Sequence, residues 1–439
     1  MKQTYLKINH KDQKPMRKIY LTLMLAITAL TMYSQESTKF ITTVDSINIY
    51  NILLENAPQN PSIKDVPRFT LVGKDSKFYL GMGANVKMVG DFDWGSPISN
   101  PNIFAPKDIP MNPEDGNRSQ TLFSVGQSNI YWNFVALPGT KNQIGLFFDV
   151  IFLGTTSKPV IEIHHLYMKY RGFTAGYVVS TFTDLKAEPY SIDFGGPASV
   201  TLVRHPNIYY TAKFGKHKEW SAQLGLDMPN MASYYNTRYT KEINQRMPDI
   251  PLFIQRSWAS DKGWLRASAI FRNLQYRGPA NGGVADAYKN KSVFGWGVKL
   301  SGKTPIAVGL SANYQGVYGK GVASYIQDFS GEQLDLVPLS GKNELQAVPV
   351  WGAYGSLQYD FGKCAFINFT YSQVRSYAKN FGEGRTDLYK YGQYITSNLI
   401  FNVSSFAQVG VEYLWGRRMN YSGQQNHDNR VMIMLNVSI

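Results

Sequence analysis

The last nine residues of the chain, 431–439, alternate in polarity up to the C-terminus. Side chains along a β-strand point to its two faces in turn, so this segment has one aliphatic and one mixed face. The aliphatic face carries Val431, Ile433, Leu435, Val437 and Ile439, and the other carries Met432, Met434, Asn436 and Ser438. Such a terminal strand is typical of the closing strand of an outer-membrane β-barrel, which has lipid on one side and the lumen on the other.

The composition favours the same class. Past the N-terminus the chain has no run of 18 apolar residues, which excludes a protein that crosses the membrane with helices. The 29 tyrosines, 24 phenylalanines and 8 tryptophans suit the aromatic girdles of a barrel. The formal net charge of +14 is spread along the chain without a basic run, so nucleic acid is not an expected partner.

Three segments are expected along the chain. Residues 1–35 are interpreted as a signal peptide, because a basic stretch precedes a short apolar stretch at 19–31. Residues 36–77 are interpreted as a periplasmic N-terminal segment. Helical periodicity at 43–55 favours a plug or a contact between subunits, and the alternative is a poorly ordered leader. Residues 78–439 are expected to form the transmembrane β-barrel.

Alternating patterns in this last region predict 16 strands, an even number, as single-chain bacterial barrels require. The connections are mostly short and long in turn, as expected for periplasmic turns and outer loops. We therefore predict an all-β fold, a 16-stranded antiparallel transmembrane barrel in the outer membrane of a Gram-negative bacterium. Long loops are expected at 91–119, 181–199, 229–249, 274–291, 315–349, 375–392 and 416–428.

Charged residues on the polar faces of these strands would line the lumen. The basic residues predicted to do so are Lys87, Arg204, Arg266, Arg272, Lys299 and Arg430, and the acidic ones are Asp149, Glu162, Asp227 and Glu412. This modest basic excess would concentrate anions in the lumen. The alternative is that these charges form mutual ion pairs that only shape the wall.

The segment that follows the fifth predicted strand, 181–199, mixes charged residues, aromatic residues and a Gly-Gly-Pro turn. We predict that it folds inward as a constriction loop, with a solvated outer loop as the alternative. Its charged residues are Asp184, Lys186, Glu188 and Asp193.

Catalytic and metal-binding motifs are absent from the sequence. His164 and His165 are adjacent in a strand, so they are expected to face opposite sides and not to share a metal. His205 and Asp193 are the nearest approach to a hydrolase pair, and we interpret them as unrelated residues of the barrel mouth. We expect no enzyme activity, no catalytic residues, no metal and no cofactor.

Several segments, in matching order, carry a resemblance to the DcaP-like outer-membrane porins: 127–128, 176–184, 193–197, 204–211, 249–251, 271–274 and 295–302. The resemblance implies a trimeric 16-stranded porin that passes small organic anions such as dicarboxylates, with an inward loop after strand five and a basic eyelet. Arg204 and Arg272 match the family pattern. The chain departs from it at Asn129, His164, Tyr209, Phe253 and Gln255, where the family often has arginine.

The expected function is therefore a diffusion channel for small hydrophilic solutes, with a mild preference for organic anions. The expected partners are outer-membrane lipid, small anionic or polar solutes and two further copies of the chain in a homotrimer. A phosphate-selective porin is the alternative within the same class. An outer-membrane hydrolase and a structural or adhesin-anchoring barrel are the alternatives from other classes.

Overall fold

The structure is a computed structural model that describes residues 46–59, 69–112, 114, 116, 118–155, 158–235, 239–281, 284–339, 343–378 and 386–439. The expected signal peptide at 1–35 lies outside the described residues, as does the rest of the N-terminal segment apart from 46–59 and 69–77. No helix in the described part is long and apolar enough to cross a membrane.

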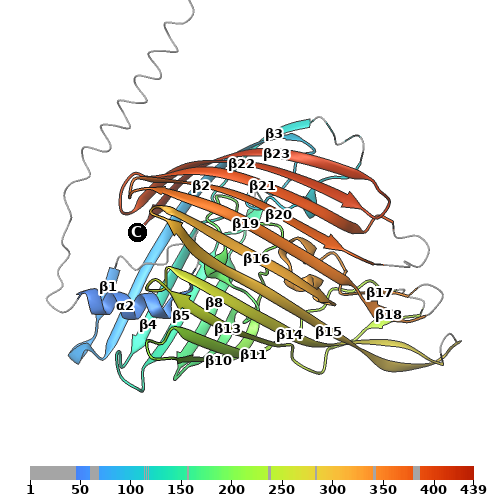
Figure 1. The fold of residues 1–439 in the computed structure, drawn as a ribbon, viewed down its shortest axis with the longest axis horizontal. Helices are drawn as coiled ribbons and strands as arrows, with labels where there is room; N and C mark the ends of the chain where they lie inside the picture. The colour runs from blue at the N-terminus through green and yellow to red at the C-terminus, as the bar shows by residue number, and fades with distance from the viewer. Residues whose placement is uncertain are drawn as a thin grey trace, which may run out of the picture.

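The chain forms a closed antiparallel β-barrel with 16 strand positions around the ring, as predicted (Figure 1). Each strand pairs with the next along the sequence, and β23 pairs with β2 to close the ring. The strands β3 and β4 both pair with β2 and together occupy one of the 16 strand positions. The barrel strands are β2 (Phe78–Gly95), β3 (Arg118–Ser124), β4 (Asn129–Ala136), β5 (Ile144–Ile151), β8 (Glu162–Tyr170), β9 (Phe173–Val179), β10 (Arg204–Phe214), β11 (Trp220–Asp227), β13 (Ile250–Trp258), β14 (Gly263–Asn281), β15 (Val284–Ala307), β16 (Leu310–Lys320), β19 (Pro349–Phe361), β20 (Ala365–Ser376), β21 (Tyr389–Asn402), β22 (Ala407–Asn420) and β23 (Gln425–Ser438).

Alternation along the strands separates the two surfaces of the barrel. In β23, Ile433 and Leu435 are 57% and 51% exposed on the outside, whereas Met432 and Met434 are buried inside. The exposed apolar side chains of the other strands extend this outer face, which suits contact with lipid. The alternation predicted for the closing strand is thus confirmed.

Two expected loops are instead extensions of strands. Residues 274–291 continue the hairpin of β14 and β15, and residues 416–428 continue that of β22 and β23. In the first case the apolar side chains of Leu274 and Tyr276 pack on a short hairpin of an outer loop, formed by β17 (Leu336–Pro338) and β18 (Leu345–Ala347). This packing stabilises as strand a stretch that was expected to be a loop.

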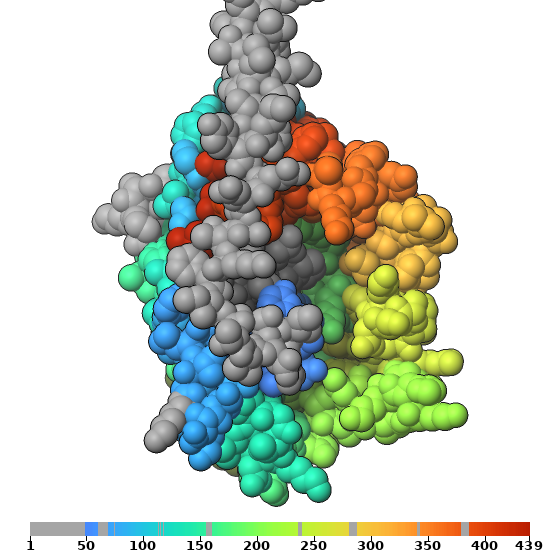
Figure 2. Space-filling model, turned by 90° about the vertical axis from the view of Figure 1, so that its left-hand side faces the viewer, coloured from blue at the N-terminus to red at the C-terminus, as the bar shows by residue number. Residues whose placement is uncertain are grey.

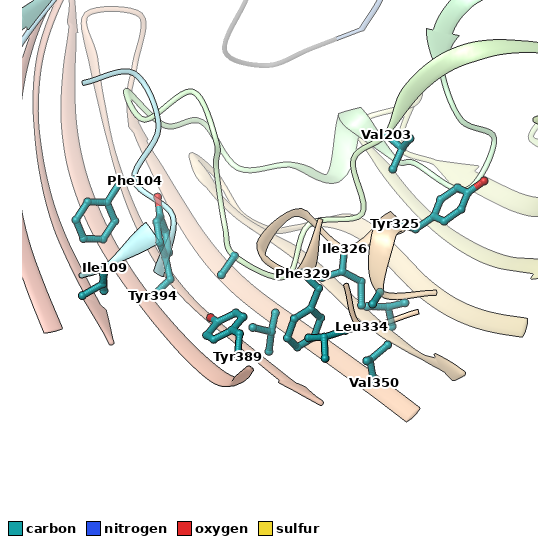
Figure 3. Close-up of a cluster of buried hydrophobic side chains, with 14 of the residues drawn as sticks. Phe104, Ile109, Val203, Tyr325, Ile326, Phe329, Leu334, Val350, Tyr389 and Tyr394 are labelled. Carbon is teal, nitrogen blue, oxygen red and sulfur yellow. The ribbon is translucent and has the colours of Figure 1, made fainter. Parts of the chain in front are cut away.

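Three outer loops fold into the barrel and pack against one another. We call the part of the chain from 180 to 203 the inner loop; the other two loops lie within 96–117 and 321–348. Their apolar residues form one buried cluster with side chains of the barrel strands that point inward (Figure 3). The cluster includes Phe104, Ile109, Ile192, Val203, Ile326, Phe329, Val350 and Tyr394. The loops therefore pack on the lumen wall partly through apolar contacts.

An N-terminal helix, α2 (Ser46–Asn56), lies at the end of the barrel that carries the short turns (Figures 1 and 2). Ile49 and Leu53 are buried against Tyr79 of β2 and Val135 of β4. Burial of each aliphatic side chain contributes about 1.5–3 kcal/mol to docking. A short strand, β1 (Phe69–Val72), then pairs with the start of β2.

Candidate functional site: a constriction inside the barrel

The inner loop is fixed to the barrel wall by hydrogen bonds from several strands. The carboxylate of Glu412 on β22 accepts the Ser191 hydroxyl at 2.7 Å and the backbone N–H groups of Ile192 and Asp193 at 2.8 and 3.1 Å. Lys87 of β2 donates from Nζ to the carbonyl of Ile192 at 3.2 Å. The middle of the loop is thereby held across the lumen.

The start of the inner loop is held by a second group of charged residues. Asp184 accepts the hydroxyl of Ser301 at 2.7 Å and lies 3.5 Å from the Arg266 guanidinium. Lys299 donates to the carbonyl of Phe182 and, at 3.1 Å, to the hydroxyl of Thr201. The ammonium of Lys299, which the sequence placed in the pore lining, thus holds the loop.

A small cavity of about 20 Å³ lies between the inner loop and the wall formed by β2, β4, β10 and β23. This volume holds about one water molecule, so the cavity marks a narrow place in the lumen. Three charged residues line it: Lys87 from β2, Arg204 from β10 and Glu188 from the inner loop. Its polar lining is completed by Asn85, Gln127, Asn129, Ser191 and Asn436. We call this place the constriction.

Burial raises the pKa values of two carboxyl groups of the inner loop beside the constriction. Burial is the main cause that raises the pKa of Glu188 to about 8, although the nearby Arg204 acts in the opposite direction. Burial likewise raises the pKa of Asp193 to about 7. At neutral pH the constriction therefore has two basic residues facing a largely protonated Glu188.

A wider cavity of about 640 Å³ opens at the end of the barrel that carries the short turns. We call it the vestibule. Its charged lining has six basic residues, Lys169, Arg171, Lys186, Lys213, Lys218 and Arg266, and three acidic residues, Glu55, Glu219 and Asp261. Basic residues thus outnumber acidic ones in the vestibule lining.

Two of the predicted pore arginines are occupied in buried ion pairs. Arg272 lies 3.0 Å from Asp249 and 3.2 Å from Asp335. Arg430 makes hydrogen bonds of 2.7 and 2.9 Å to the carboxylate of Asp93. Both guanidinium groups also donate to backbone carbonyls of the outer loops, so they hold those loops inside the barrel instead of facing a solute path.

The remaining predicted residues occupy different environments. Glu162 is exposed at the start of β8, whereas Lys186 is exposed in the vestibule. Asp193 is buried and accepts the backbone N–H of Phe104 at 2.8 Å, which ties two outer loops together. Asp227 is buried 3.0 Å from Nε2 of His205. Since Asp193 and His205 have these separate partners, they do not form the hydrolase pair that the sequence raised.

The expectation that His164 and His165 face opposite sides is wrong. A β-bulge interrupts the pairing of β5 with β8, because Asp149 lies opposite His165 while Val150 lies opposite Ile163. The extra residue turns both imidazoles inward, where both are buried. Nδ1 of His164 and Nδ1 of His165 lie 2.7 and 2.9 Å from the two carboxylate oxygens of Asp149.

These three residues offer potential metal ligands within 4.8 Å of one another. The surrounding hydrogen bonds argue against that use. Arg204 donates from Nε to Nε2 of His165 at 3.4 Å, so that nitrogen must carry the lone pair. The proton of a neutral His165 then lies on Nδ1 and points at Asp149, which leaves Nδ1 no lone pair for a metal.

Three of the vestibule lysines, Lys169, Lys213 and Lys218, and the contacts of α2 were not found from the sequence. Lys169 follows the bulge in β8, which changes which residues of the strand point into the barrel. Its Nζ donates to the carbonyls of Glu55 and Asn56, both at 3.0 Å. The Tyr167 hydroxyl also donates to the carbonyl of Asn56, at 2.6 Å. The only available signal was the unusual His-His pair, which suggests an irregular strand.

Replacement of Gly145 by valine should displace α2 from the barrel. A Cβ at this position would collide with the side-chain amide of Asn56, which donates to Asn133 at 2.7 Å and to the carbonyl of Leu146 at 3.1 Å. We expect faster chymotryptic cleavage within α2, after Tyr50 or Leu53.

Gly355→Val is the matched control, because that position is exposed on a strand and a Cβ there meets nothing within 4 Å. Equal cleavage rates in the two variants would contradict the docking of α2.

The closed barrel, its apolar outer face and its inward-folded loops define an outer-membrane β-barrel of the porin type. Comparison with protein-family models and with curated protein sequences gave no match. Among solved structures, the outer membrane channel DcaP of Acinetobacter baumannii aligns with a TM-score of 0.67 and 18% identity, over 84% of this chain and 100% of that chain.

Two further structures align less well. OmpT, an outer membrane protein of Vibrio cholerae, has a TM-score of 0.49 and 10% identity, over 84% of this chain and 99% of that one. OprB of Pseudomonas putida also has a TM-score of 0.49 and 10% identity, over 82% and 94% of the two chains. The resemblance to DcaP-like porins expected from the sequence is thus confirmed at the level of the fold.

Proposed function

We propose that the protein is an outer-membrane porin through which small hydrophilic solutes diffuse, with a mild preference for organic anions such as dicarboxylates. The observation that carries the proposal is the constriction, where Lys87 and Arg204 face Glu188 across a water-sized cavity. The basic lining of the vestibule supports the same preference. Solutes would pass beside the inner loop, since this loop is fixed to the opposite wall.

The proposal extends to the organisation of the chain. Residues 1–35 would direct export, residues 36–77 would form a periplasmic segment and residues 78–439 the barrel. The position of α2 at the end with the short turns, and the start of β2 at Phe78, support these boundaries. We also propose that three copies assemble in the outer membrane, with part of the apolar outer face covered by neighbouring copies. The proposed role is passive and involves no catalysis.

The double variant Lys87→Gln/Arg204→Gln should lower the anion-to-cation permeability ratio in planar bilayers under a KCl gradient. A unit charge about 4 Å from an ion contributes about 1 kcal/mol in water, which corresponds to about fivefold per removed cation. The control is Lys363→Gln, which removes an exposed charge in the turn between β19 and β20. An unchanged ratio in the double variant would remove the basis for anion preference at the constriction.

A further inference from the structure

The buried residues Asp149, His164 and His165 lie beside the constriction but do not line its cavity. Asp149 is fully buried, so its carboxylate requires hydrogen-bond donors in place of water. The two imidazoles supply one donor to each of its oxygens. Because a carboxylate only accepts, both Nδ1 atoms carry protons in this arrangement.

The two histidines differ at their other ring nitrogen. Nε2 of His165 accepts the N–H of Arg204 Nε at 3.4 Å, whereas Nε2 of His164 is buried without a hydrogen-bond partner. A hydrogen-bonded series thus runs from Asp149 through His165 to Arg204. The fixed tautomer of His165 is what allows it to accept from a guanidinium, which can only donate.

We propose that His165, held by Asp149, positions the guanidinium of Arg204 at the constriction and thereby sets part of its selectivity for anions. This inference rests on the proposed porin function. The bond through Nε fixes one edge of the guanidinium, while Arg204 lines the cavity opposite Glu188. An arginine without this support would spread its charge over several rotamers.

The neighbouring aromatic rings restrict the imidazoles in the same orientation. The ring of His165 lies edge-on to Phe147 and to Tyr167, with centroid distances of 6.2 and 6.3 Å. The ring of His164 lies 6.0 Å from that of Phe194 in the inner loop. Close packing on both sides means that the imidazoles keep their roles without large rotations.

Asparagine substitutions separate the two histidines. The side-chain N–H of asparagine takes the place of Nδ1–H, so His165→Asn and His164→Asn both retain a donor to Asp149. Both variants lose the ring contacts, but His165→Asn also loses the acceptor for Arg204, whereas the Nε2 that His164→Asn removes has no hydrogen-bond partner in the structure. The second variant is therefore a matched control for the first.

In planar bilayers under a KCl gradient, His165→Asn should shift the reversal potential in the same direction as Arg204→Gln, while His164→Asn should leave it unchanged. In an Arg204→Gln background, His165→Asn should add no further shift. Equal shifts in the two histidine variants, or full additivity with Arg204→Gln, would overturn the positioning role.

A spectroscopic measurement tests the arrangement without reference to transport. In the detergent-solubilised protein labelled with ¹⁵N-histidine, His165 should be a neutral Nδ1–H tautomer, and Arg204→Gln should shift its Nε2 resonance. An Nε2–H tautomer of His165, or an Nε2 chemical shift that Arg204→Gln leaves unchanged, would overturn the proposal. If these resonances behave as expected but Arg204→Gln leaves the reversal potential unchanged, the proposed anion selectivity fails and so does the selectivity role of His165, whereas the hydrogen-bonded arrangement stands.

Discussion

Replacement of Glu412 by alanine should release the middle of the inner loop and raise the single-channel conductance. The variant removes the acceptor for the Ser191 hydroxyl and for the N–H groups of Ile192 and Asp193. Hydrogen bonds to a charged group contribute about 1.5–3 kcal/mol each, so the loss of three weakens docking of this segment by on the order of 3 kcal/mol or more. Bilayer recordings would then show larger and noisier steps.

Glu162→Ala is the control, because this exposed residue at the start of β8 has the same charge but lies away from the inner loop. Heat-modified migration on gels should show that both variants retain the barrel. If Glu412→Ala gives the conductance and noise of the unmodified protein, the inner loop does not limit the passage.

The anion preference should fall as the pH rises from 6 to 9. The raised pKa values of Glu188, about 8, and Asp193, about 7, mean that both carboxyl groups are mainly neutral at pH 6. Raising the pH ionises first Asp193 and then Glu188, which faces Lys87 and Arg204 across the constriction. The new negative charge offsets the charge of the basic residues, so the reversal potential should move toward the value expected for a cation-selective channel.

Glu188→Gln should weaken the upper part of this pH dependence, near pH 8, and retain the lower part. The same variant should have the stronger anion preference at pH 9, since it cannot ionise. A pH profile that is identical with and without Glu188→Gln would contradict its place at the constriction.

The strands of the barrel could be predicted because the membrane imposes a simple rule on them. Outward residues such as Ile433 and Leu435 meet lipid, and alternation with Met432 and Met434 is visible in the sequence. The connections were harder to predict. Residues 274–291 have a loop-like composition and become strand because Leu274 and Tyr276 pack on a distant segment.

The candidate site depends on similar long-range effects. The alternation of side chains along the strands predicted that Lys87 and Lys299 point into the barrel. It could not show that Lys299 holds the inner loop while Lys87 also lines the constriction. The prediction from alternation was wrong for His164 and His165 because a single bulge changes the direction of one side chain. Neither the bulge nor the bond from His165 to Arg204 has a reliable local signature.

The reversal potential of the unmodified protein under a tenfold KCl gradient tests the central claim most directly. We expect steady, stepwise conductance and a reversal potential with the sign of anion selectivity, because Lys87 and Arg204 line the constriction and the vestibule is basic. A cation-sided reversal potential would contradict the proposed selectivity, and the absence of any conductance would contradict the porin function itself.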